Sequence, residues 1–170
     1  MKRIFAQCDL KVFLTMSALA LFYLFLLIYN SQKVAITDDA RFYMTAAKSY
    51  QSYFEKCSPF SSCFKKNMID RYFRENNEHP PFAKYLMASG YWLFHKKFKV
   101  LDEIRSLRIG ISIFAVIVLM FIFSFVRRAF SFYAAVFASL AFIFLPRTLF
   151  HARVATLDFA VAGTSFIFVY

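Results

Sequence analysis

The chain has 170 residues, about the size of one ordinary domain, but its composition is not that of a soluble domain. Apolar residues make up 60% and charged residues 18%, against roughly 45–50% and about 25% in typical soluble proteins. The 21 basic and 10 acidic residues give a formal net charge of +11, which could suggest a nucleic-acid partner. The apolar residues, however, lie in long uncharged blocks, and we therefore predict an integral membrane protein.

Three of these blocks have about the length that a helix needs to cross a bilayer. They are residues 12–29, residues 109–126 and residues 129–146. At ~1.5 Å per residue, such runs approach the ~30 Å thickness of the hydrocarbon core. In lipid they must be helical, because the backbone has no other hydrogen-bond partner. A fourth apolar run, residues 158–170, is too short to span, so we expect residues 1–170 to be the N-terminal part of a longer protein.

The order of these blocks predicts the topology. The first could instead be a signal peptide, with Lys2 and Arg3 as its basic flank. Its apolar stretch exceeds the usual ~7–15 residues, and no small-x-small cleavage motif follows it, which favours an uncleaved span with a cytoplasmic N-terminus. Residues 30–108 then form an external loop, the arginine pair 127–128 lies inside, and residues 146–158 lie outside.

Two segments of the external loop are predicted to be juxtamembrane helices at the outer surface, over about 38–54 and about 80–95. The second begins on a proline pair, and its Tyr91 and Trp92 suit the headgroup level. Its apolar run is short for a span. If residues 82–94 did span, the lysines after them would be cytoplasmic and the arginine pair external. The predicted fold class is thus an all-α, multi-span helical membrane bundle.

Ionisable side chains are absent from the three predicted spans and gather instead near their outer ends. Three groups are, in chain order, Asp38 and Asp39; Glu78, His79 and Lys84; and His151, Arg153 and Asp158. Each has an ordinary structural explanation. Thr37 or Asp38 could cap a helix, as could Asp158, and Glu78 and His79 could form a loop ion pair or bind a divalent metal ion.

Other motifs are weak. Cys57 and Cys63 bracket a five-residue loop on the predicted outer side, where a disulfide is allowed and two free thiols are equally compatible with the sequence. No glycine-rich phosphate loop, paired CxxC or HExxH motif occurs. The basic residues are dispersed along the membrane flanks, so anionic lipid, and not nucleic acid, is the expected partner.

In this order, the segments DDARFY, EHPPFAKYL and HARVATLD resemble the N-terminal third of a GT-C fold glycosyltransferase that uses a polyprenyl-phosphate-linked sugar. The protein O-mannosyltransferases and the lipid A aminoarabinose transferases are the most similar groups. Asp39 stands where glutamate is common in the family. His79 stands where the aminoarabinose transferases carry lysine, so the sequence favours the mannosyltransferase pattern.

The resemblance implies transfer of the sugar, with inversion, to an acceptor hydroxyl on a protein or glycolipid at the periplasmic side of a bacterial inner membrane. Asp38 would be the general base, with Asp39 as its support and Asp158 positioning the acceptor or the sugar. Glu78 and His79 would hold a divalent metal ion or contact the carrier phosphate. The residues implied to bind the carrier phosphate are Arg41, His79, Lys84, Arg105, Arg108 and Arg153.

The histidine that binds metal in some members of this family would lie beyond residue 170, so we expect this chain alone to lack transfer activity. A non-catalytic small membrane protein, or a truncated remnant that packs against membrane partners, is the main alternative. Part of a transporter is disfavoured, because no polar residue interrupts the spans and no internal repeat is visible.

Overall fold

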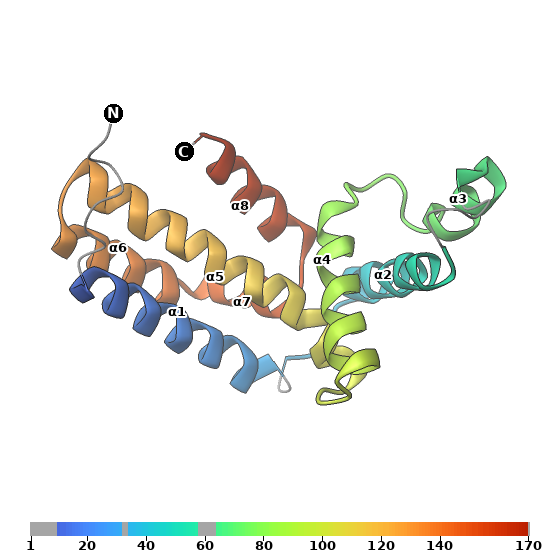
Figure 1. The fold of residues 1–170 in the computed structure, drawn as a ribbon, viewed down its shortest axis with the longest axis horizontal. Coiled ribbons are helices and arrows are strands. Elements are labelled where there is room, and N and C mark those ends of the chain that lie inside the picture. The colour runs from blue at the N-terminus through green and yellow to red at the C-terminus, as the bar shows by residue number, and fades with distance from the viewer. Residues whose placement is uncertain (1–9, 32–33, 58–63, 170) are drawn as a thin grey trace.

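The computed structural model describes residues 10–31, 34–57 and 64–169, and this part of the chain is helical, without a strand (Figure 1). The all-α prediction is therefore confirmed. The elements are α1 (Leu10–Ser31), α2 (Asp38–Lys56), α3 (Lys66–Phe73), α4 (Phe82–Gly90), the π-helix η2 (Tyr91–Lys97), α5 (Glu103–Ala129), α6 (Phe132–Phe144), α7 (Pro146–Val154) and α8 (Leu157–Val169).

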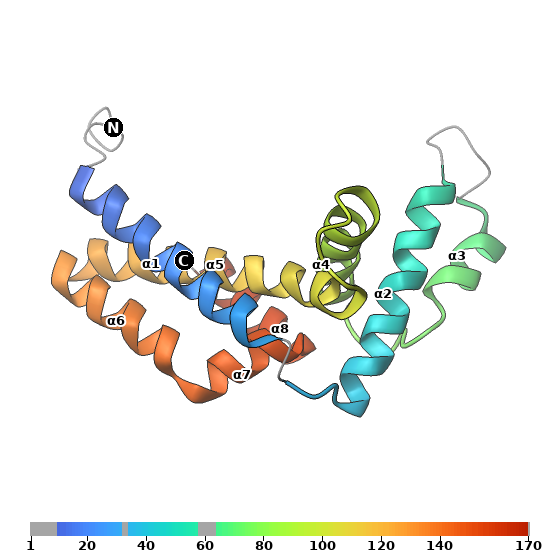
Figure 2. The same ribbon diagram turned by 90° about the horizontal axis from the view of Figure 1, so that it is seen from below.

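The helices form two groups with different directions. The long helices α1, α5 and α6 run alongside one another, and α8 turns back along α5 (Figures 1 and 2). The shorter helices α2, α3 and α4 lie at one end of this bundle, and α2 and α4 run across the direction of α5. The predicted external loop therefore forms a helical layer at one end of the apolar helices.

Two helices, α1 and α5, are long and apolar enough to cross a membrane. The third predicted span, residues 129–146, contains a helix of only 13 residues, α6, which is too short to cross a bilayer alone. Helix α6 ends at Phe144, and α7 departs from it at an angle of 60°. The break falls before Pro146, which lacks an amide hydrogen and disfavours the helical conformation at the residue before it. If α6 and α7 are counted as one broken span, the described chain has three candidate spans.

The predicted surface helices correspond to α2 and to α4 with η2. Helix α2 begins as expected, and of the two predicted capping residues it is Thr37 whose Oγ1 accepts a hydrogen bond from the Ala40 amide, at 3.3 Å. The buried face of α2 carries Met44, Ala47 and Tyr50 and packs on α4. The amphipathic pattern thus predicted the position of this helix in the sequence correctly. The buried apolar face of α2 packs against α4 of the same chain.

Helices α4 and α5 cross with their backbones close together, and glycine allows this approach. A Cβ atom added to Gly110 would lie 1.8 Å from the Leu86 carbonyl oxygen, and one added to Gly90 would lie 2.5 Å from the Ser106 carbonyl oxygen. Neither position has room for a side chain, because the obstacle is backbone of the other helix. The crossing fixes the angle at which the end layer meets the long helices.

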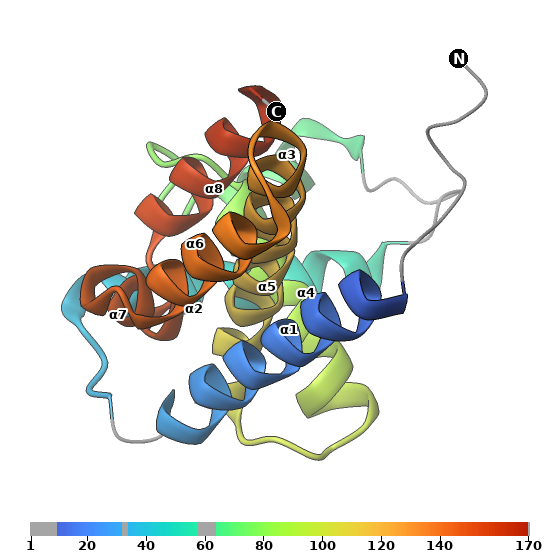
Figure 3. The same ribbon diagram turned by 90° about the vertical axis from the view of Figure 1, so that its left-hand side faces the viewer.

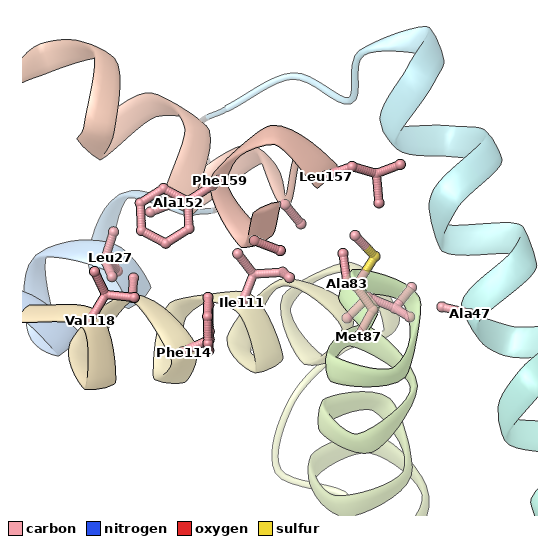
Figure 4. Packing of buried hydrophobic residues seen from close by; sticks show 14 of the residues in the cluster. Leu27, Ala47, Ala83, Met87, Ile111, Phe114, Val118, Ala152, Leu157 and Phe159 are labelled. Carbon is pink, nitrogen blue, oxygen red and sulfur yellow. The ribbon is translucent and has the colours of Figure 1, made fainter. Parts of the chain in front are cut away.

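A single apolar cluster joins α4 and α5 to α1, α2, α7 and α8 (Figure 4). Met87 of α4 and Ile111 of α5 are fully buried at its centre. Ala152 of α7 and Leu157 and Phe159 of α8 close it from the other side. This packing places the start of α8 beside the end layer, where the third polar group of the sequence lies.

Candidate functional site

At least one member of each of the three polar groups of the sequence acts on Tyr43, a residue of α2. Asp39, Asp158 and Glu78 lie close enough for their charges to act on the Tyr43 hydroxyl. The His79 ring stands edge-on to the Tyr43 ring, with 5.7 Å between the ring centroids. One ring contact, from His79, and three carboxylate charges, from α2, from the segment before α4 and from α8, therefore act on the same phenol.

Local structure explains why these side chains face the same place. Asp39 and Tyr43 are four residues apart on α2, so they share one face of the helix. Asp158 lies in the first turn of α8, and an acidic side chain is favoured there by the helix dipole. Glu78 and His79 lie between a left-handed residue, Asn76 with φ of 55°, and the proline pair that precedes α4.

The acidic side chains of this site are available for a ligand. Asp39, Glu78 and Asp158 are exposed, and none makes a hydrogen bond or ion pair in the described part of the chain. The same holds for Asp38, which precedes Asp39 in the chain but is not one of the three carboxylates whose charges act on Tyr43. Partial burial, followed by the charges of Asp39, Asp158 and Glu78, raises the pKa of Tyr43 above its ordinary value. The Tyr43 hydroxyl thus remains a hydrogen-bond donor at neutral pH. Such a set of groups can accept hydroxyl protons, bind a cation and donate one hydrogen bond.

Lys84 holds the segment that carries Glu78 and His79. Its side chain is fully buried, and Nζ donates to the carbonyl oxygens of Asn76 and His79, the latter at 3.2 Å. Burial lowers the pKa of Lys84, and the charge of Glu78 acts in the opposite direction. Lys84 therefore holds the turn of residues 76–79 against α4 through these hydrogen bonds. The sequence did not reveal this role.

We expect Lys84→Met to loosen this turn. Methionine keeps the length and apolar stem of the side chain but removes the donors to two carbonyl groups, and hydrogen bonds from a charged donor contribute about 1.5–3 kcal/mol. Amide hydrogen exchange in residues 75–79 should become at least about tenfold faster in the variant. The control is Lys48→Met, which removes an exposed ion pair with Glu103 and should leave that exchange unchanged. Equal exchange in the wild type and Lys84→Met would contradict the fastening role.

Two of the arginines that were predicted to bind phosphate instead donate hydrogen bonds to backbone carbonyl groups of this chain. Arg108 is 1% exposed and donates to the carbonyl oxygens of Ser31, Val34 and Ala35, the latter two at 3.0 and 3.2 Å. It thereby ties the connection between α1 and α2 to α5. Nη2 of Arg153 donates to the Leu26 carbonyl at 3.1 Å and ties α7 to α1 in the same way.

Of the other predicted phosphate-binding residues, some are paired within the protein and some are exposed to solvent. Arg105 pairs with Asp102, the residue that caps α5. Arg41 and His79 are exposed, and Arg41 follows Asp39 in the first turns of α2. Arg41 and His79 are therefore the predicted contacts that could reach a phosphate without rearrangement.

A metal ion at this site remains a prediction. Within the described ranges, no group of three or more His, Cys, Asp or Glu side chains is placed to hold a metal ion. Glu78 and His79 could supply two ligands, and a third would have to come from another residue or from a bound substrate.

Sequence reasoning missed Tyr43, although a signal was present. The spacing from Asp39 puts the phenol on the face of the carboxylate, but an aromatic residue on an amphipathic helix is usually part of an apolar face. The sequence left open whether Cys57 and Cys63 form a disulfide or are free thiols. Cys57 is disulfide-bonded, and Cys63 lies outside the described residues.

Comparisons with known proteins gave no relative: no family model, no curated protein and no solved structure matches this chain. The resemblance to GT-C glycosyltransferases therefore rests on the three sequence segments alone. A function has to be inferred from the arrangement around Tyr43 and from the apolar helices.

Proposed function

We propose that this chain is a membrane protein that contributes the carboxylate side of the active site of a glycosyltransferase, with a polyprenyl-phosphate-linked sugar as donor. The observation that carries the proposal is the meeting of Asp39, Glu78, His79 and Asp158 around Tyr43. Segments separated by more than a hundred residues supply these groups. Unpaired carboxylates beside a phenol and an imidazole suit the recognition of hydroxyl groups.

In this proposal Asp38 takes the proton of the acceptor hydroxyl as the acceptor oxygen attacks the anomeric carbon. The bond between that carbon and the phosphate oxygen breaks, and the phosphate leaves with the electron pair. Because phosphate is a good leaving group, it needs positive charge and hydrogen bonds more than a proton donor. Arg41, His79 and the protonated Tyr43 are the groups that we assign to it, and Asp39 and Asp158 would orient hydroxyl groups.

The membrane setting is supported by composition and arrangement. The helices α1 and α5 are long and apolar enough to cross a bilayer, and the site lies in the layer of helices at one end of them (Figure 1). The disulfide at Cys57 favours an oxidising compartment for that layer. We therefore propose that the site faces the outer side, as in a bacterial inner-membrane protein with a cytoplasmic N-terminus.

The proposal is tested by deleting the gene in its source organism. Isolated membranes would receive radiolabelled mannose or aminoarabinose on a polyprenyl phosphate, and label in protein and glycolipid would be measured. Deletion should remove transfer from one of these donors, and a restored gene should recover it. Transfer from a polyprenyl-pyrophosphate-linked sugar serves as the control and should not change. Unchanged transfer from both monophosphate donors would contradict the proposal and favour a non-catalytic membrane protein.

A further inference from the structure

A second surface of the molecule lies away from the carboxylate site, at the end of η2. We define the tip as residues 91–101, which comprise η2 and the turn that leads to α5. In two views the tip lies beside the C-terminal end of α1, on the side of the bundle opposite α8 (Figures 1 and 3). A segment that reaches sideways from the end of the apolar helices would meet the surface of a surrounding bilayer.

The π-helical register arranges the side chains of the tip in pairs. In a π-helix the hydrogen bonds join residues five apart, so side chains five apart come close together. Nζ of Lys96 lies 5.7 Å from the Tyr91 ring centroid, and Nζ of Lys97 lies 5.2 Å from that of Trp92. Lys97 also lies 5.8 Å from the Phe98 ring centroid. Ammonium groups are thus held over aromatic rings along one edge of the helix.

The turn after η2 is ordered and exposes apolar residues. The Phe98 amide donates to the Leu93 carbonyl at 3.0 Å, and the Val100 amide donates to the Phe94 carbonyl at 3.0 Å. Lys99 adopts a left-handed conformation with φ of 54° between them. Large apolar side chains nevertheless remain open to solvent, since Phe98 is 56% and Val100 65% exposed. Phe98 stands edge-on to Phe94, with 6.5 Å between the ring centroids, but more than half of its surface stays exposed.

The ionised side chains of the tip are all positively charged. No acidic residue occurs between Glu78 and Asp102. The two acids that follow the tip are paired, Asp102 with Arg105 and Glu103 with Lys48. Lys96, Lys97 and Lys99 are exposed, and none of them forms an ion pair within the described residues. The acidic side chain on the α2 side of the tip is Glu55, which lines a pocket together with Trp92.

We propose that the tip binds the headgroup layer of a bilayer that contains anionic lipid. Trp92 and Phe98 would lie at the boundary between headgroups and acyl chains, where aromatic rings are favoured. The three lysines would lie above them at the level of the lipid phosphates, and each basic residue at an anionic surface adds to the attraction. This proposal does not depend on glycosyl transfer. It would fix the depth of α4, and with it the distance of the carboxylate site from the membrane.

The single tryptophan of the chain, Trp92, makes the test direct. The full chain is reconstituted into bilayers that contain equal fractions of phosphatidylcholine and phosphatidylglycerol, with one of the two brominated near the glycerol in each sample. We expect brominated phosphatidylglycerol to quench Trp92 emission at least about twofold more than brominated phosphatidylcholine, because three lysines should enrich the anionic lipid. High salt should reduce this difference.

The decisive variant carries three substitutions, Lys96→Gln, Lys97→Gln and Lys99→Gln. In this variant the two brominated lipids should quench Trp92 emission equally, because Trp92 stays at the interface but the anionic lipid is no longer enriched. Its matched control is Lys65→Gln, Lys66→Gln, Arg74→Gln, which removes the same charge from exposed positions at the ends of α3 and should keep the preference. Equal quenching in the wild type, or a preference that survives in the tip variant, overturns the proposal. So does an emission that neither brominated lipid quenches, which would assign the surface to another partner.

Discussion

Gly110→Ala should cost about 3 kcal/mol of unfolding free energy, at the upper end of what an overpacked helix contact costs. The new methyl group would lie 1.8 Å from the Leu86 carbonyl oxygen and 2.5 Å from its carbonyl carbon. These atoms belong to the backbone of α4, so the two helices must separate. Separation would also open the apolar cluster around Met87 and Ile111. Unfolding by SDS in mixed micelles, followed by the emission of Trp92, measures the loss.

Gly163→Ala is the matched control for this change. Its methyl group would meet the side chains of Phe114 and Val118, each at 2.8 Å, and both can shift. Alanine also stabilises a helix by about 1 kcal/mol relative to glycine, so the net change should be within about 1 kcal/mol. If the two variants lose equal stability, or if Gly110→Ala loses none, the close crossing does not determine the position of α4.

The sequence predicted most helices because their signals are local. Uncharged apolar blocks identified α1 and α5, and the capped amphipathic pattern identified α2. The crossing of α4 over α5 could not be predicted, since nothing adjacent to Gly90 or Gly110 in the chain indicates that the two glycines face each other. The third predicted block ended at Pro146, where α6 and α7 separate, but hydropathy did not reveal that the straight helix within that block has only 13 residues.

The candidate site was predicted in part. The sequence indicated three polar groups near the ends of apolar helices, and members of all three lie around Tyr43. The sequence did not reveal which basic side chains hydrogen-bond within the protein and are therefore not available to a ligand. Lys84, Arg108 and Arg153 carry the same charge as Arg41, but they donate to backbone carbonyl groups of other segments. The bonds of Arg108 and Arg153 join segments 74 and 127 residues apart, so local sequence pattern carries no sign of them.

Asp38→Asn should reduce glycosyl transfer by ~10²–10⁴-fold if Asp38 is the general base, which corresponds to about 3–5 kcal/mol of transition-state stabilisation. Asparagine keeps the size of the side chain and one acceptor oxygen, but it cannot take the proton of an acceptor hydroxyl. The Asp38 carboxylate is exposed and has no partner in the described part of the chain, so it is free for this task. Transfer in membranes that carry the substituted gene measures the effect.

A role of Asp38 in helix stability predicts a different result. Thr37 already caps α2, and a first-turn carboxylate adds only about 0.3–1 kcal/mol through the helix dipole, so a structural role would leave turnover nearly unchanged. Asp39→Asn, which keeps Asp38 and changes the neighbour that faces Tyr43, should lower turnover less than Asp38→Asn. Asp70→Asn on α3 controls for the loss of one exposed charge. If Asp38→Asn keeps more than about a tenth of wild-type turnover, Asp38 is not the base. If instead Asp39→Asn has the larger effect, the proton goes to the carboxylate beside Tyr43.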